Sequence, residues 1–515
     1  MAGAWGFIGP TYQSQNPAVD AEFILNMYPE IVESGHGSAA AKMAYYHTPG
    51  SSVFGSVSGA VRALWGGNNR LFVVGGGNLY ELSVTSGAVL HTYAIRNASG
   101  PAQIVFVPSG PGLTGPTSGA LLVWDGTDGT LDNIWYVDGT TPSPPALISG
   151  VGVGCIDGYG VVLRPPIPPG NGSGTVPINT IDGTQFNISE IFLGNVWDPL
   201  DFGIKTGAPD QLQMIFTPGS FGGGGPEELW LFGKRTTEVW YNTGGSALDP
   251  FPFQRVPGAF INQGLWAPNS ICNCNNQLTF LGGDDRGVGI VWAMNGYTPV
   301  RVSNHAIEYL IQQFVIAGID VSDAIGYSEQ RTGHINYVLT FPTAGVTVVA
   351  DFSCPDASGR PMWHQRARGA SLGSLSASWK FHAWTGGKHF VAGDGTGNVY
   401  ASDLNTYQDS GSPILRCRVG PNPTQGLQWK RHGQFWLQIG GPYSAVTGRT
   451  YNLDWSNDGG SNYGTSFALN PQQNTTKGIA RVLKNNLGRA RSRNYRIQST
   501  NNAPEAWLDA DLTLS

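Results

Sequence analysis

The feature that most constrains the fold of this chain is a recurring hairpin pattern. In residues 228–245, "ELWLFGKRTTEVWYNTGG", two runs of aliphatic and aromatic residues flank a short polar turn, and a Gly-containing exit follows. Such runs joined by tight turns are typical of antiparallel β-hairpins. Related units recur about 40–50 residues apart, which is the spacing of β-propeller blades.

The recurring units share an order of strands and turns but have different amino-acid sequences. Each has a strand, a Gly-rich turn, a strand that contains an aromatic residue, and an exit turn; further examples are 62–87, 120–139, 276–303 and 380–404. The pattern predicts an all-β protein with a β-propeller of six or seven degenerate blades over residues 61–412. We expect residues 1–60 to be an N-terminal segment that joins the first blades.

One segment departs from the strand pattern. In "SNHAIEYLIQQFVIAG" (303–318) the apolar residues recur at helical spacing after a Ser-Asn start, which suits a helix N-cap. We expect a single helix beside the blades. After about residue 412 the strands have longer polar connections, which predicts a separate, basic, β-sandwich-like domain over 413–515.

Composition narrows the class of protein. Only 12% of residues are charged, about half the usual share, and Gly (73) and Pro (34) are abundant. The sequence contains no apolar run of about 18 residues, so we expect no membrane span. The N-terminus lacks the pattern of a signal peptide. The five cysteines, Cys155, Cys272, Cys274, Cys354 and Cys417, lack framework spacing, so we expect free thiols and synthesis in a cytosol.

Charge is distributed unevenly along the chain. Residues 413–515 contain 12 Lys or Arg and 5 Asp or Glu, whereas 1–412 contain 17 and 30. Within the basic part, "KGIARVLKNNLGRARSRNYR" has no acid and contains Lys477, Arg481, Lys484, Arg489, Arg491, Arg493 and Arg496. These residues predict either a DNA-facing strip that contacts phosphates without reading bases, or a contact with a neighbouring subunit's acidic propeller; a plain solvated surface is the third alternative.

Motifs for catalysis, metals and cofactors are absent or incomplete. Gly233-Lys234 resembles part of a phosphate-binding loop, but a strand follows where that loop needs a helix, so a hairpin turn is the better interpretation. Cys272 and Cys274 lack a second pair of ligands nearby. "SNDGGSNY" (456–463) resembles the Asp-box turn of sialidases and other propellers, which is structural. The sequence predicts no catalytic residues, no metal site and no cofactor.

Longer segments resemble one family, the packaged-DNA stabilisation or tail-hub (nozzle) proteins of short-tailed double-stranded DNA phages. The resemblance is carried, in order along the chain, by 24–37, 47–51, 228–244, 251–270, 282–312, 387–414 and 451–497, and is densest at 228–312. It implies a structural protein of the virion tail, assembled in the host cytoplasm and forming a ring, usually of six copies.

The same resemblance implies the partners. They are the portal and adaptor ring proteins, tail fibre, spike or needle proteins, and packaged double-stranded DNA bound without sequence preference. The main alternative is a glycan-binding or glycan-hydrolysing β-propeller, which the Asp-box-like turn and the abundant Trp favour. A ring with a central channel would separate the first function from a monomer with a glycan pocket. A cellular scaffolding propeller is a third alternative.

Overall fold

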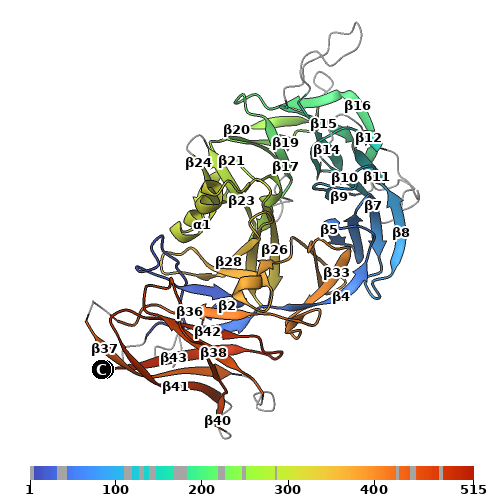
Figure 1. The fold of residues 1–515 in the computed structure, drawn as a ribbon. Coiled ribbons are helices and arrows are strands. Elements are labelled where there is room, and N and C mark those ends of the chain that lie inside the picture. The colour runs from blue at the N-terminus through green and yellow to red at the C-terminus, as the bar shows by residue number, and fades with distance from the viewer. Residues whose placement is uncertain are drawn as a thin grey trace.

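The fold combines a ring of small sheets with a two-sheet sandwich (Figure 1). The computed structural model describes residues 5–31, 43–108, 119–126, 133–138, 146–166, 183–218, 227–245, 251–284, 287–424, 428–440, 448–474 and 479–515. Within these residues seven blade sheets surround a common axis, which confirms the predicted all-β propeller.

The first four blades follow one another along the chain as antiparallel four-stranded sheets. Blade 1 contains β5 (Val61–Gly67), β6 (Arg70–Gly75), β7 (Asn78–Leu82) and β8 (Val89–Ala94). Blade 2 contains β9 (Gln103–Val107), β10 (Ala120–Trp124), β11 (Ile134–Val137) and β12 (Ala146–Ile148). Blade 3 contains β13 (Val153–Ile156), β14 (Tyr159–Leu163), β15 (Gln185–Glu190) and β16 (Leu193–Ile204). Blade 4 contains β17 (Leu212–Phe216), β18 (Glu228–Gly233), β19 (Thr237–Asn242) and β20 (Phe253–Ile261).

The last three blades are less regular. Blade 5 contains β21 (Gly264–Leu265), β22 (Cys272–Cys274), β23 (Gln277–Asp284), β24 (Gly287–Asn295) and β25 (Thr298–Arg301), with the 3-10 turn η1 (Pro268–Ser270). Blade 6 contains β26 (Ile325–Arg331), β27 (His334–Phe341), β28 (Val346–Pro355) and β29 (Pro361–Arg368), with β30 (Ser376–Ala377) added to β29 and η2 (Leu372–Ser374) nearby. Blade 7 contains β31 (Phe381–Thr385), β32 (Lys388–Ala392) and β33 (Asn398–Asp403).

Strand β4 (Gly50–Ser56) of the N-terminal segment completes the last blade, and Phe54 and Val57 of the same segment pack with Val61 and Leu71 of blade 1. Strand β4 pairs antiparallel with β33, with Val53 opposite Tyr400. Short strands β34 (Gln408–Asp409) and β35 (Ser412–Pro413) extend the same sheet. The ring is therefore closed by hydrogen bonds between segments about 350 residues apart in the sequence, which a local hairpin pattern does not specify.

Turn chemistry explains why the hairpins form where the sequence predicts them. Asn68 and Asn69, between β5 and β6, both have positive φ (51° and 58°). Two-residue turns of this kind match the right-handed twist of the flanking strands, and Asn tolerates the left-handed conformation. Asn275 and Asn276 repeat the arrangement between β22 and β23, with φ of 54° and 56°.

Apolar layers join most neighbouring blades, but the seam between blades 6 and 7 is polar. Clusters such as Phe72, Leu79, Leu121 and Val123 fill the space between blades 1 and 2. At the blade 6–7 seam the carboxylate of Glu329 is buried between the guanidinium groups of Arg331 and Arg366. Arg331 also donates to the carbonyl oxygen of Ser402 in blade 7 (3.0 Å). An ion network therefore connects the two blades next to the closure.

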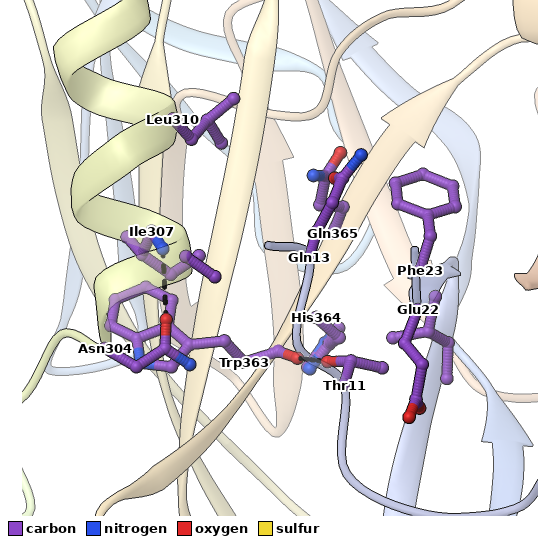
Figure 2. Close-up of a pocket in the computed structure, with 12 residues that line it drawn as sticks. Thr11, Gln13, Glu22, Phe23, Asn304, Ile307, Leu310, Trp363, His364 and Gln365 are labelled. Carbon is purple, nitrogen blue, oxygen red and sulfur yellow. Dashed lines mark hydrogen bonds between the residues drawn. The ribbon is translucent and has the colours of Figure 1, made fainter. Parts of the chain in front are cut away.

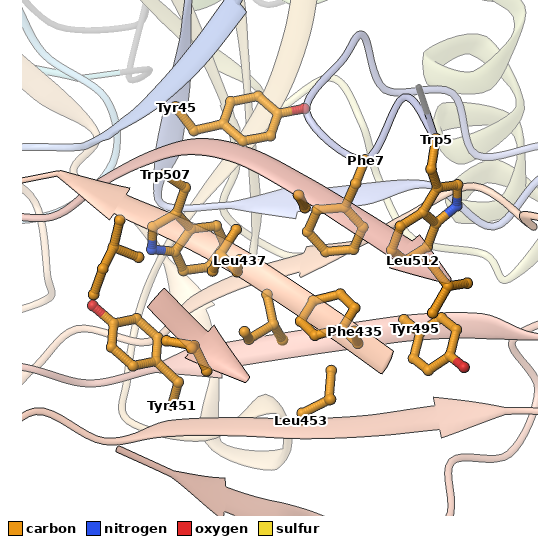
Figure 3. Close-up of a cluster of buried hydrophobic side chains, with 14 of the residues drawn as sticks. Trp5, Phe7, Tyr45, Phe435, Leu437, Tyr451, Leu453, Tyr495, Trp507 and Leu512 are labelled. Atoms are coloured by element: carbon orange, nitrogen blue, oxygen red, sulfur yellow. The ribbon is translucent and has the colours of Figure 1, made fainter. Parts of the chain in front are cut away.

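The C-terminal sandwich uses N-terminal strands as well as its own. One sheet contains β1 (Phe23–Leu25), β36 (Arg416–Val419), β42 (Asn494–Ser499), β38 (Tyr451–Ser456) and β39 (Phe467–Leu469), and β1 also pairs with β29 of blade 6. The other contains β2 (Met27–Ile31), β3 (Met43–His47), β43 (Ala506–Leu514), β37 (Lys430–Gly440), β41 (Ile479–Ala490) and β40 (Gln472–Asn474). Figure 3 shows the aromatic core between them, to which Trp5, Phe7 and Tyr45 contribute from the N-terminal segment.

Helix α1 (His305–Ile316) lies beside blades 5 and 6, as the helical spacing predicts. The Asn304 side chain caps it by accepting a hydrogen bond from the backbone N–H of Ile307 (3.0 Å). Figure 2 shows the N-terminal segment running close by, where the Thr11 hydroxyl donates to the carbonyl oxygen of Trp363 (2.6 Å). Across the described ranges, no helix combines the length and apolar character needed to span a membrane.

Candidate functional site

The basic strip predicted from the sequence does not form one surface. Lys477 lies outside the described residues. Arg481, Lys484 and Arg489 lie on β41, Arg491 lies in the bend after it, and Arg493 and Arg496 lie immediately before and within β42. These six described residues divide into groups with different surroundings.

Arg493 is buried, with 4% of its surface exposed, and it stabilises the fold. Its guanidinium donates to the Asn457 side-chain oxygen (2.8 Å) and to the carbonyl oxygen of Leu487. It also lies over the rings of Trp455 and Tyr495, 5.1 and 5.8 Å from their centroids. Arg493 therefore cannot contact DNA or a neighbouring subunit while the sandwich is folded.

Arg496 and Lys484 are also engaged within the sandwich. Arg496 makes a two-pronged ion pair with Asp454 (2.9 and 2.7 Å) and lies 3.7 Å over the Tyr463 ring. Burial alone would lower the pKa of Arg496, but the hydrogen bond and charge of Asp454 raise it. Lys484 is half-buried, with its ammonium 4.0 Å from the Phe467 ring centroid.

The exposed cations at one end of β41 gather with residues that the sequence prediction missed. Arg489 lies opposite Arg431 on β37, and Lys430 lies opposite Ala490. The Arg491 guanidinium lies 5.1 Å over the ring of Trp429, which is 56% exposed. We call Trp429, Lys430, Arg431, Arg489 and Arg491 the basic patch. Arg481, over Trp436 at 5.3 Å, lies near the other end of the strand.

The basic patch has the chemistry of a surface for an anionic partner. None of its four cations forms an ion pair with an acid in the part of the chain that the structure describes. Like charges directly opposite each other on a sheet destabilise it, and an anionic partner relieves the repulsion. Only the letters "WKR" at 429–431 could have indicated the missing residues, and their pairing with Arg489 depends on strand register.

The backbone of the Gly233-Lys234 turn binds an internal carboxylate. Asp210 accepts hydrogen bonds from the backbone N–H groups of Lys234 (3.1 Å), Arg235 (2.9 Å) and Thr236 (2.8 Å). The backbone donors that a phosphate would use are therefore occupied, in agreement with the hairpin interpretation.

The Asp-box-like turn also uses its carboxylate internally. Asp458 accepts a hydrogen bond from the backbone N–H of Asn462 (2.9 Å), and hydrogen bonds lower the pKa of Asp458 to about 2.

The five cysteines are free, and three of them are poor nucleophiles. Burial raises the pKa of Cys155, Cys274 and Cys417 to about 12. Because the thiolate is the reactive form, these side chains are unsuited to nucleophilic attack near neutral pH.

A cluster of His334, Asp351 and Cys354 is the one group of metal-type ligands found among the described residues. His334 Nδ1 lies 2.6 Å from Asp351 and Nε2 lies 2.7 Å from Glu30 of β2, so both ring nitrogens face carboxylates. Burial alone would lower the pKa of His334, but hydrogen bonds with Asp351, Cys354 and Glu30 raise it to about 11. His334, Asp351 and Glu30 thus form an ion triad that joins the N-terminal segment to blade 6.

The triad predicts a pH-dependent contribution to stability. Because the pKa of His334 rises from 6.5 to about 11 on folding, its stabilisation is complete below about pH 6.5 and is lost as the pH rises toward 11. We expect the difference in free energy of unfolding between the native protein and a His334→Gln variant to shrink steadily over that range. Urea denaturation at a series of pH values measures it, and a constant difference would contradict the assignment.

The fold is a β-propeller joined to a β-sandwich, and the basic patch lies on the sandwich. Residues 9–407 match the family model described as "Bacteriophage P22 Gp10, beta-propeller", and the chain belongs to this family of phage structural proteins. No curated protein matches the sequence.

Two solved structures are among those similar to the chain. The Neurospora crassa Pan2 WD40 domain has 11% identity and a TM-score of 0.36, over 68% of this chain and 94% of that one. BBS1N, solved in complex with ARL6DN, has 9% identity and a TM-score of 0.35, over 69% and 96%. Neither likeness bears on function.

Proposed function

We propose that the chain is a subunit of a hexameric tail hub, or nozzle, that closes the portal channel and retains packaged DNA in the virion. In this role it contacts portal and adaptor ring proteins and anchors tail fibres, spikes or a needle, without enzymatic activity or a cofactor. The family membership supports the phage structural role. The basic patch is the observation that supports DNA retention, because its cations lack acidic partners in the described residues.

The patch suits a DNA backbone for electrostatic reasons. Lys and Arg that neutralise phosphates release counterions, so binding falls steeply as salt rises and does not depend on sequence. Each subunit supplies Lys430, Arg431, Arg489 and Arg491. A ring repeats this set around its channel, and the summed potential is much stronger than that of one subunit.

The test replaces exposed arginines without touching the core. In Arg489→Gln/Arg491→Gln particles, we expect normal assembly and earlier DNA release on heating. For the purified protein, the slope of log affinity for a short duplex against log salt should fall by about 1 for each arginine removed. Arg481→Gln is the matched control, because this exposed arginine lies on the same strand outside the patch.

Two results would contradict DNA retention by the patch. Assembled variant particles that hold DNA as well as the native virion would show that these arginines do not contact the genome. Particles that lack the protein altogether would favour the alternative interpretation, in which the patch binds the acidic propeller of a neighbouring subunit.

A further inference from the structure

The cluster around His334 has the ligand types of a metal site as well as the charges of an ion triad. A ring nitrogen of His334, a carboxylate oxygen of Asp351 and the sulfur of Cys354 all lie within 4.8 Å of one another. All three residues are buried. Imidazole nitrogen, carboxylate oxygen and thiolate sulfur are the three kinds of side-chain ligand that Zn²⁺ takes in proteins.

A β-bulge brings two of these ligands to the same place. Asp351 and Cys354 are three residues apart on β28, and side chains at this spacing point to opposite faces of a regular strand. The pairing of β28 with β29 shifts its register between Asp351 and Pro355, so the strand is irregular where Cys354 lies. Bulges re-aim side chains in this way and are frequent beside functional sites. His334, the first residue of β27, completes the group.

The distances within the group are close to those that a zinc ion needs. His334 Nδ1 lies 2.6 Å from Asp351 Oδ2 and 3.9 Å from Cys354 Sγ. Tetrahedral zinc, with bonds of about 2.0–2.3 Å, holds nitrogen and oxygen ligands about 3.3 Å apart and nitrogen and sulfur ligands about 3.6 Å apart. Side-chain movements of less than about 1 Å therefore bring the three atoms to the positions of zinc ligands.

The groups around the ligands are arranged as in zinc proteins. The second ring nitrogen of His334, Nε2, lies 2.7 Å from the Glu30 carboxylate, and Tyr28 packs edge-on against the ring with centroids 4.8 Å apart. Asp351 Oδ1 accepts a hydrogen bond from the backbone N–H of Ser353 (3.0 Å). Metal-bound histidines usually donate their other N–H to a carboxylate, and metal-bound carboxylates are themselves hydrogen-bonded. These contacts orient Nδ1 and Oδ2 toward the position of the ion.

We propose that His334 Nδ1, Asp351 Oδ2 and Cys354 Sγ bind a structural Zn²⁺ ion. The ion takes the place of the proton that His334 and Asp351 share in the metal-free protein. The Cys354 thiol, which otherwise donates to the Pro29 carbonyl oxygen (3.3 Å), binds as the thiolate, and both protons leave to solvent. Water completes the tetrahedron. Thiolate and imidazole select zinc over Mg²⁺ or Ca²⁺, which prefer oxygen ligands alone.

The site lies where the propeller meets the sandwich. Its three ligands come from β27 and β28 of blade 6, whereas Glu30 belongs to β2 of the sandwich, which lies next to β28 (Figure 1). The Glu30 side chain is 44% exposed, so solvent reaches the edge of the cluster. Zinc would strengthen this junction. DNA retention by the basic patch does not depend on it, and so the site extends beyond the function proposed above.

The test uses the full chain, treated with a chelator and then titrated with Zn²⁺ alone. We expect one Zn²⁺ per chain by native mass spectrometry and a melting temperature that rises with bound zinc. Glu30→Gln, which changes an outer contact, should weaken zinc binding by about 10–100-fold, and Cys354→Ser should weaken it by more than about 100-fold. Cys417→Ser is the matched control, because Cys417 is also buried but lies on β36, outside the cluster.

Co²⁺ provides a readout that a purely structural role of Cys354 would not change. A thiolate-to-cobalt charge-transfer absorption should appear with the native protein and be absent with Cys354→Ser. If Cys354→Ser does not fold, as judged by circular dichroism, the spectrum of the native protein with Co²⁺ still decides the assignment. A protein that takes up no Zn²⁺, unchanged zinc affinity in Cys354→Ser, or equal stabilisation by Mg²⁺ would each overturn the proposal.

Discussion

Replacing Glu329 by glutamine is expected to lower the free energy of unfolding by about 3–5 kcal/mol, because the change leaves buried guanidinium groups without a counter-charge. Glu329 is 3% exposed and pairs with both Arg331 and Arg366, the latter at 2.6 Å. Burial alone would raise the pKa of Glu329, but these two charges hold it well below its ordinary value. The carboxylate is therefore ionised in the folded protein.

The location of this network makes it important for the whole ring. Blade 7 is completed by β4 from the N-terminal segment, and the seam beside it is held by the Glu329 network together with a Tyr327–His382 ring contact at 5.3 Å. Because the folded pKa of Glu329 is depressed, its stabilisation is present above the unfolded value of 4.5 and is lost as the pH falls further.

Urea denaturation followed by Trp fluorescence measures the effect. Glu190→Gln is the control, because Glu190 is an exposed carboxylate at the end of β15 and should change stability by less than about 0.5 kcal/mol. A Glu329→Gln variant with a loss below about 1 kcal/mol would show that the seam is held by other contacts.

Arg493→Gln is expected to destabilise the sandwich by about 2–4 kcal/mol, whereas Arg491→Gln should change stability by less than about 0.5 kcal/mol. The two arginines are two residues apart in "RSR", but buried Arg493 donates to the carbonyl oxygen of Leu487 and to the side chain of Asn457, whereas Arg491 lies over exposed Trp429. Glutamine at 493 cannot reach both acceptors, so a buried carbonyl oxygen is left unsatisfied.

Replacing Arg489, Arg491 and Arg493 together is therefore expected to disturb the fold as well as the surface. A variant that includes Arg493 would lose sandwich stability, and any loss of DNA or of assembly could not then be assigned to the surface. Thermal melts of the two single variants test the distinction. Equal melting temperatures would mean that Arg493 contributes as little as an exposed arginine.

Features that depend on near neighbours in the chain could be predicted from the sequence. Hairpin turns such as Asn68-Asn69, the N-cap of α1 at Asn304 and the alternation of apolar residues all arise from contacts within a few residues, so their patterns predicted strands, helix and propeller class. The hairpin at Gly233-Lys234 was predictable for the same reason.

Which distant segments pair with each other could be seen only in the folded protein. Pairing of β4 with β33, of β3 with β43 and of Arg431 with Arg489 joins residues 58 or more positions apart, and the register of such pairs is set by the whole core. The same applies to burial: Arg493 and Arg491 have similar neighbours in the sequence, but only Arg493 faces Trp455 and Tyr495. A run of charged residues in a sequence shows how many charges are present. Packing determines which of those charges are exposed to solvent.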